Sequence, residues 1–134
     1  MQKRRIINAG KYNKKITIVK KIPNKLRDGT QGEGRLVPIL ECYAQIKTTR
    51  GYTIIRNDSD FENAKICFFI RYSKKVDDAY NKGIYIENDE EKHTSLRNLL
   101  VIFKGNQYVV EYFNNIDLDN LEIELQTRRV MGYN

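Results

Sequence analysis

The chain of 134 residues contains no tryptophan, one histidine, two cysteines and two prolines. The cysteines, Cys42 and Cys67, form no CxxC pair, so the ligand spacing of a zinc site is missing. We expect both to be reduced thiols buried in strands. The longest purely apolar run, residues 99–103, is far too short to span a membrane. We therefore expect no metal, no cofactor and no membrane-spanning helix.

Catalytic side chains are equally sparse. His93 lies two residues from Ser95 in a segment without a regular pattern, which is not the arrangement of a Ser-His-Asp triad. The paired aspartates at residues 77–78 and at 117 and 119 occur in turn sequences, where Asp accepts local backbone hydrogen bonds. We therefore expect that the protein is not an enzyme.

Positive charge is concentrated at the start of the chain. Residues 1–35 hold 11 Lys and Arg against 2 Asp and Glu, a net of +9, whereas the other 99 residues hold 13 against 15, a net of −2. The opening arm lacks the central apolar region of a signal peptide, so we expect the protein in the cytoplasm of the producing cell. Such an arm suits contact with nucleic acid or an acidic protein surface, and a solvated arm is the alternative.

A period of two dominates the apolar pattern, most clearly over residues 99–125. Two β-branched and aromatic runs flank Gly105-Asn106, and residues 121–125 alternate apolar with polar side chains. This pattern predicts a hairpin with a tight primed turn at Gly105-Asn106, followed by a third antiparallel strand. Both hairpin arms are partly apolar on two faces, so the second face is covered either within the domain or by another subunit.

Three more strands are predicted upstream, over residues 15–20, 39–47 and 64–72. Residues 57–62 offer a helix N-cap and one helical turn. Residues 73–98 have the pattern of a long irregular connection with a short strand at 84–86. The side chains expected to face the core of the three strands are Ile16 and Ile18; Leu40, Cys42, Ala44 and Ile46; and Ala64, Ile66, Phe68, Ile70 and Tyr72.

The pattern as a whole predicts one all-β domain over residues 1–134. We expect a small six-stranded antiparallel β-barrel or barrel-like sandwich over residues 14–129, with at most one short helix. A basic N-terminal arm, residues 1–13, precedes it. Long loops are expected at residues 48–62 and 73–98.

Several short motifs follow one another along the chain. A glycine and basic residues lead into a strand, and then come an Asp-Gly turn, an aromatic-Ala-x-Ile strand with a later glycine, an apolar-Arg-aromatic element, an x-Gly hairpin and an alternating strand. In this order the series resembles the phage head–tail joining proteins, the head-closure, adaptor or stopper proteins of long-tailed bacteriophages. Tyr43 stands where that family often has Trp, and the connection 73–98 is longer than typical. The matching segments are residues 10–19, 28–29, 43–47 with Gly51, 69–72, 103–110 and 121–125.

The resemblance implies a non-enzymatic virion structural protein. Such a protein forms a ring, a hexamer or a dodecamer, at the head–tail connector, where it closes the DNA-filled head below the portal and presents the tail attachment surface. The implied partners are further copies of the chain, a portal or adaptor protein above, a tail protein below and genomic DNA in the channel, with no membrane. The implied location is the virion, and the host cytoplasm during assembly.

Three sets of residues are candidate contact sites. The arm set, which is expected to meet the next subunit or an acidic partner, consists of Lys3, Arg4, Arg5, Lys11, Lys14 and Lys15. The channel set, which the resemblance implies would narrow the central channel, consists of Thr49, Arg50, Gly51, Tyr52 and Arg56. The acidic set, which is expected to dock on the portal or tail, consists of Glu87, Asp89, Glu90 and Glu91.

Two other functions fit parts of the sequence. One is a tail-completion or tail-terminator ring protein, which belongs to the tail. The other is a nucleic-acid-binding barrel, in which some of the nine tyrosines and five phenylalanines would stack on bases. Most of these aromatic residues lie on the predicted core faces and are not interleaved with basic residues, which disfavours the second function.

Overall fold

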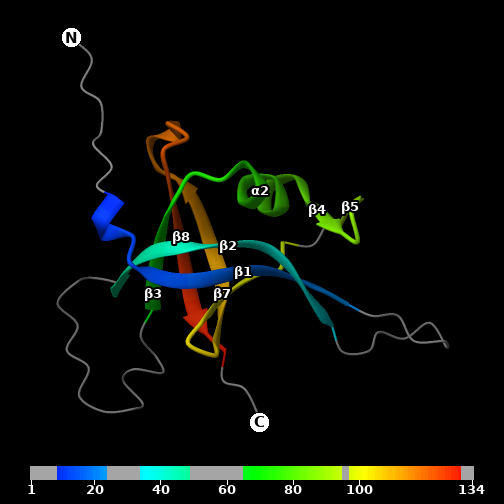
Figure 1. Cartoon of the computed structure of the whole chain (residues 1–134), viewed down its shortest axis with the longest axis horizontal. Coiled ribbons are helices and arrows are strands. Elements are labelled where there is room, and N and C mark those ends of the chain that lie inside the picture. Colours follow the sequence, from blue (N-terminus) through cyan, green and yellow to red (C-terminus); the bar gives the residue numbers. More distant parts are fainter. Residues whose placement is uncertain (1–8, 24–33, 49–64, 95–96, 131–134) are drawn as a thin grey trace.

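The computed structural model describes residues 9–23, 34–48, 65–94 and 97–130. Six strands form one antiparallel sheet that closes into a barrel in the order β1-β2-β3-β8-β7-β6 (Figure 1). Pairing of β1 with β6, from Thr17 opposite Ile102 to Lys20 opposite Leu99, completes the ring of strands. The predicted all-β fold class is therefore confirmed. The bounds are β1 (Lys14–Ile22), β2 (Arg35–Thr48), β3 (Lys65–Arg71), β6 (Leu99–Phe103), β7 (Asn106–Asn115) and β8 (Glu122–Arg129).

A β-bulge explains why β2 begins before its predicted start at residue 39. Ile18 pairs with Leu40 but Val19 pairs with Pro38, which leaves Ile39 as the extra residue on β2. Proline cannot donate to a strand ladder and is tolerated in sheets at bulges and edges. The bulge therefore lets β2 continue through Pro38 to Arg35, although the proline interrupts the sequence pattern.

The hairpin of β6 and β7 is present, but its turn lies one residue earlier than predicted. Phe103 pairs with Asn106, so the two turn residues are Lys104 and Gly105 rather than Gly105 and Asn106. Both have positive φ, 50° and 79°, as primed turns require. Asn106 is instead the first residue of β7.

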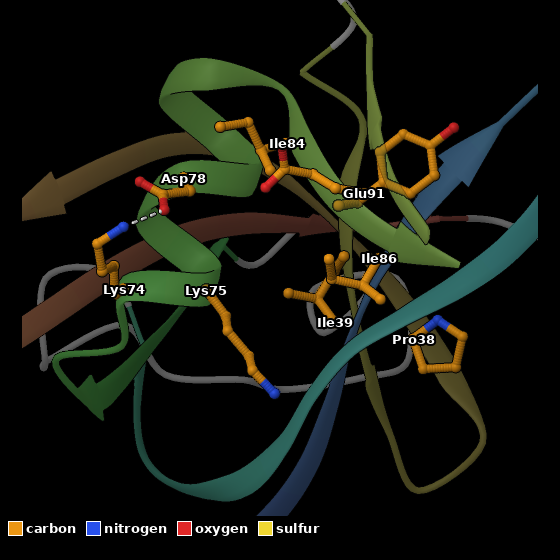
Figure 2. Close-up of a pocket in the computed structure, with 9 residues that line it drawn as sticks. Pro38, Ile39, Lys74, Lys75, Asp78, Ile84, Ile86 and Glu91 are labelled. Carbon is orange, nitrogen blue, oxygen red and sulfur yellow. Dashed lines mark hydrogen bonds and ion pairs between the residues drawn. The ribbon is translucent and has the colours of Figure 1, made fainter. Parts of the chain in front are cut away.

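The connection between β3 and β6 is regular for most of its length, so the prediction of a long irregular segment was wrong. It contains the short helix α2 (Lys74–Asp77), the π-helical turn η2 (Asp78–Lys82) and a hairpin of β4 (Ile84–Glu87) and β5 (Glu90–His93) (Figures 1 and 2). Only the short strand expected at residues 84–86 was correctly placed. The helical turn expected at residues 57–62 lies outside the described residues.

Ser73 and Gly83 set the limits of the helical segment. The Ser73 side chain accepts a hydrogen bond from the backbone N–H of Val76 at 3.4 Å. Gly83 has a φ of 71°, and a Cβ at this position would lie 1.7 Å from the carbonyl oxygen of Thr94. A serine N-cap and a left-handed glycine are the ordinary start and stop signals of a helix. These signals were present in the sequence, but the segment between them is too short for a clear helical period.

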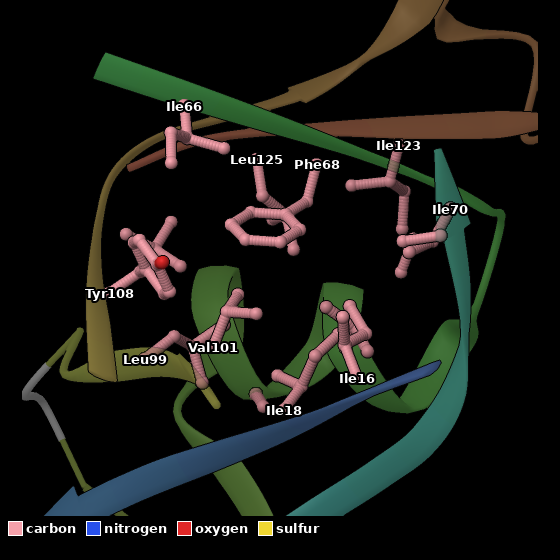
Figure 3. Close-up of a cluster of buried hydrophobic side chains, with 14 residues drawn as sticks. Ile16, Ile18, Ile66, Phe68, Ile70, Leu99, Val101, Tyr108, Ile123 and Leu125 are labelled. Atoms are coloured by element: carbon pink, nitrogen blue, oxygen red, sulfur yellow. The ribbon is translucent and has the colours of Figure 1, made fainter. Parts of the chain in front are cut away.

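The inward side chains of all six strands fill the barrel (Figure 3). Phe68 is fully buried, and its ring centroid lies 5.4 Å from that of Tyr108 and 6.1 Å from that of Phe103, both in edge-on contact. Val76 and Ala79 join the same cluster, so the helical segment closes one end of the barrel. The cluster comprises Ile16, Ile18, Ala44, Ile66, Phe68, Ile70, Val76, Ala79, Leu99, Val101, Tyr108, Val110, Ile123 and Leu125.

A buried lysine ties this helical segment to β1. Lys20 has no exposed surface, and its Nζ donates a hydrogen bond to the carbonyl oxygen of Ala79 at 2.9 Å. Burial lowers the pKa of Lys20, because removal from water disfavours the ammonium form. The contact joins η2 to the strand at which the barrel closes.

Candidate assembly surfaces

The basic arm is fastened to the barrel at a buried carboxylate. Glu122, at the start of β8, is 4% exposed, and its Oε2 accepts a hydrogen bond from the hydroxyl of Tyr12 at 2.7 Å. Lys11 Nζ lies 2.8 Å from the same oxygen, and the guanidinium of Arg71 lies 5.4 Å from the centre of the Tyr12 ring. A buried carboxylate is tolerated when it is paired and hydrogen-bonded. This cluster therefore determines where the arm leaves the barrel.

The other residues of the arm set differ in their surroundings. Lys15 Nζ lies 2.6 Å from Glu41 Oε1 in a pair whose side chains are 63% and 59% exposed. Lys14 is exposed, and Lys3, Arg4 and Arg5 lie outside the described residues. An exposed ion pair contributes little to stability, so Lys15 can exchange its partner at low cost. Of the predicted basic face, the structure thus shows Lys11 in a structural pair and Lys14 and Lys15 at the surface.

Glu87, from the acidic set, holds the β4–β5 hairpin against the start of β2. Its carboxylate accepts hydrogen bonds from Arg35 Nε and Nη2, both at 2.8 Å, and from Lys92 Nζ at 2.9 Å. These hydrogen bonds, that of Arg35 first, lower the pKa of Glu87 from its ordinary 4.5 to about 2. Glu87 is therefore engaged within the chain.

The other acidic residues project from the hairpin. Asn88 and Asp89 form its turn with φ values of 54° and 62°, and Asp89, Glu90 and Glu91 are exposed. Glu91 Oε2 lies 3.3 Å from Nε2 of His93. The hairpin thus presents a negatively charged edge to its surroundings.

A cleft of about 410 Å³ lies between this hairpin, α2 and β2 (Figure 2). Its floor is apolar, and Ile39 and Ile86 lie side by side there, with Ile86 51% exposed. On the helix wall Lys74 Nζ lies 2.8 Å from Asp78 Oδ2. An exposed aliphatic side chain in a concave, charge-rimmed surface is typical of a contact site. The lining residues are Pro38, Ile39, Lys74, Lys75, Asp78, Ile84, Tyr85, Ile86 and Glu91.

Sequence reasoning missed this cleft, because its walls come from separate segments that only the tertiary fold brings together. It also missed Leu118, which is 85% exposed in the turn η3 (Ile116–Leu118) between β7 and β8. Leu118 and Asp117 have φ values of 55° and 56°. The side-chain amide of Asn115 donates a hydrogen bond to Asn120 Oδ1 at 2.6 Å across the turn. The Asn- and Asp-rich sequence predicts a turn. It does not show that a leucine stands at its tip.

The channel set, Thr49, Arg50, Gly51, Tyr52 and Arg56, lies outside the described residues. Its flanks are described: β2 ends at Thr48 and β3 begins at Lys65. Because α2 follows the other end of β3, Thr48 and Lys65 lie at the barrel end opposite the helical segment (Figure 1).

Chemically reactive groups are few in the part of the chain that the structure describes. No cluster of three or more His, Cys, Asp or Glu side chains there could hold a metal ion, and no helix there is long and apolar enough to cross a membrane. Cys42 and Cys67 are not joined in a disulfide, and burial raises the pKa of Cys42 to about 11. A thiol with such a pKa is protonated at neutral pH and is a poor nucleophile.

The comparison with known families agrees with this picture of contact surfaces on a rigid barrel. A family model described as phage head completion protein matches residues 7–128. The match includes the barrel, the acidic hairpin and residues 49–64. No curated protein matches the chain.

Proposed function

The chain belongs to the phage head completion protein family, and from this premise we propose that it forms a ring at the head–tail connector of the virion. The ring closes the DNA-filled head below the portal and provides the surface to which the tail attaches. The chain acts by binding rather than by catalysis. It contacts further copies of itself, a portal or adaptor protein on one side and a tail protein on the other.

The observation that carries this proposal, beside the family, is the difference between the two ends of the barrel. One end is closed by α2 and η2. The strand ends that flank residues 49–64, at Thr48 and Lys65, lie at the opposite end. A ring in which every subunit presents two unlike ends can meet one protein above and another below, while unlike lateral patches join the copies head to tail.

We assign the narrowing of the channel to residues 48–62. They interrupt the alternation between two well-defined strands, and Gly51 offers a pivot within them. The arm and the acidic hairpin are the proposed sites of contact with neighbours. The DNA in the channel then meets the channel set of Thr49, Arg50, Gly51, Tyr52 and Arg56.

Complementation of a phage that lacks the gene tests these assignments. Heads filled without the chain should lose their DNA and fail to bind tails. A variant shortened within residues 49–62 should still join heads but leak DNA, whereas a variant without residues 1–13 should fail in joining. Wild-type numbers of joined, DNA-filled particles in the absence of the chain would contradict the proposal. Full DNA retention by the shortened variant would contradict the channel assignment alone.

Heads and tails from the same complementation experiment, together with the isolated protein, distinguish the proposed function from the two alternatives. A tail-completion protein co-purifies with free tails, whereas a head-closure protein co-purifies with tailless heads. A nucleic-acid-binding barrel binds DNA as an isolated protein, with an affinity that falls steeply as salt rises.

A further inference from the structure

The β4–β5 hairpin that forms one wall of the cleft is acidic, and of its carboxylates Glu91 lines the cleft itself. Residues 84–93 contain four carboxylates, Glu87, Asp89, Glu90 and Glu91, against the single cation Lys92, a net of −3 with His93 neutral. Glu87 is engaged with Arg35, and the other three carboxylates are exposed. The opposite wall carries Lys74 and Lys75, of which Lys74 is paired with Asp78. Within the cleft Asp78 and Glu91 balance Lys74 and Lys75 in charge. The negative charge that a partner meets therefore lies along the exposed edge of the hairpin, at Asp89 and Glu90.

The floor of the cleft calls for an apolar group in the same partner. Ile86 exposes 51% of its surface there, beside the partly buried Ile39 (Figure 2). Covering such a side chain removes apolar surface from water, which favours binding. The fitting partner is thus a short segment that combines several cations with one or two aliphatic side chains.

Residues 1–8 of the chain have this composition. Their sequence, Met-Gln-Lys-Arg-Arg-Ile-Ile-Asn, carries three cations, a net of +3, followed directly by two isoleucines. This charge is opposite in sign to that of the exposed Asp89, Glu90 and Glu91. Glu87 does not add to the attraction, because Arg35 and Lys92 already compensate its charge. In an extended segment side chains alternate, so one isoleucine can face the cleft floor.

We propose that the cleft of one copy binds residues 1–8 of the neighbouring copy. This inference rests on the proposed ring, and it names the contact that joins adjacent subunits. The root of the arm at η1 (Ala9–Lys11) and the β4–β5 hairpin lie on opposite sides of the barrel (Figure 1). An arm on one side and its receptor on the other form the unlike pair of patches that head-to-tail association requires.

The hairpin also has room for an extended segment. Its sheet has only two strands, β4 and β5, in the part of the chain that the structure describes, so each strand keeps one edge without a strand partner there. Such edges accept an added strand through main-chain hydrogen bonds, and side-chain pockets then supply the specificity.

A photo-cross-linking experiment tests the contact directly. Benzoylphenylalanine is placed at Ile86 of the full-length chain, and this protein is mixed with isotope-labelled wild-type chain and added to filled heads that lack the chain. After irradiation we expect cross-linked peptides that join residue 86 to isotope-labelled residues 1–8. The matched control places the cross-linker at Tyr112, which is also 51% exposed but lies on β7; it should not capture residues 1–8. Capture of residues 1–8 only from the same, unlabelled chain would overturn the proposal.

Charge reversal supplies an independent measurement. Arg4→Glu with Arg5→Glu, or Glu90→Lys with Glu91→Lys, should each reduce head–tail joining by about tenfold, as expected for the loss of a few exposed ion pairs. The two reversals combined should restore joining, because the opposite charges then face each other again. Absence of rescue would overturn the proposal.

The outcomes distinguish the arm contact from the ring itself. If head-bound chain forms cross-links between copies but none from residue 86 to residues 1–8, only the arm contact is wrong. If a general lysine cross-linker finds no contact between copies at all, the ring is wrong as well.

Discussion

Replacing Glu122 by alanine tests whether the buried carboxylate anchors the arm. The change removes the acceptor of the Tyr12 hydroxyl at 2.7 Å and the partner of Lys11 at 2.8 Å, at a position that is 4% exposed. Removing one partner of a buried ion pair costs roughly 3–5 kcal/mol, and the side chain of Lys11 is 27% exposed and thus partly hydrated. We therefore expect a loss near the lower limit, about 3 kcal/mol of unfolding free energy.

The size of this effect can be measured in two ways. A loss of about 3 kcal/mol corresponds to a fall in Tm of about 10 °C for a domain of this length. Because the chain contains no tryptophan, far-UV circular dichroism in urea is the suitable probe. Hydrogen exchange should also become faster at Tyr12 and its neighbours. Glu122→Gln should cost less than Glu122→Ala, since the amide oxygen still accepts a hydrogen bond from Tyr12.

A matched control lies on the neighbouring surface. Glu41→Ala removes an ion pair with Lys15 that is even shorter, 2.6 Å, but whose side chains are both more than half exposed. We expect no measurable change, because water compensates exposed charges. If Glu122→Ala also changes the unfolding free energy by less than about 0.5 kcal/mol, as an ordinary surface substitution does, the anchoring role of Glu122 is refuted.

Three further outcomes are expected. The hydrogen bonds from Arg35 and Lys92 hold the pKa of Glu87 at about 2, below its ordinary 4.5. Its carboxylate therefore stabilises the folded chain above pH 4.5, and this contribution is lost as the pH falls towards 2. Thermal unfolding across this range should show a larger loss of stability in wild-type protein than in Glu87→Gln, where Asp78, whose pKa is also lowered, still contributes. Lys104 has a positive φ of 50° in the hairpin turn, which glycine adopts without strain. Lys104→Gly should therefore raise the free energy of unfolding, measured in urea, by up to about 1 kcal/mol. A decrease would contradict the turn geometry. Leu118→Asn should leave the Tm unchanged or slightly higher, since the side chain is 85% exposed at a φ of 55° that Asn tolerates; a large drop would show that Leu118 is buried in solution.

Local alternation predicted the six strands of the barrel and, at most positions, the side of each strand that faces the core. The last strand departs from it at its start, where Leu121 is 39% exposed and Glu122 is buried. Ile16, Ile18, Phe68 and Ile123 are all at most 1% exposed, as the period of two requires. The reason is geometric: successive side chains of a strand point to opposite faces, so the apolar set determines the buried face. The motif order likewise identified the family, which the match over residues 7–128 confirms.

The tertiary structure alone decided which distant residues meet. Tyr12 and Glu122 are 110 positions apart, yet they share a hydrogen bond because the closed barrel brings the arm to the start of β8. The cleft has the same origin, since its walls come from β2, α2 and the β4–β5 hairpin, which are brought together by the packing of α2 on the barrel. Lys20 shows the limit most clearly: its charge suggests a solvent-exposed side chain, but barrel closure buries it completely against Ala79. Periodicity describes neighbours along one strand, whereas contacts between elements depend on how the sheet closes.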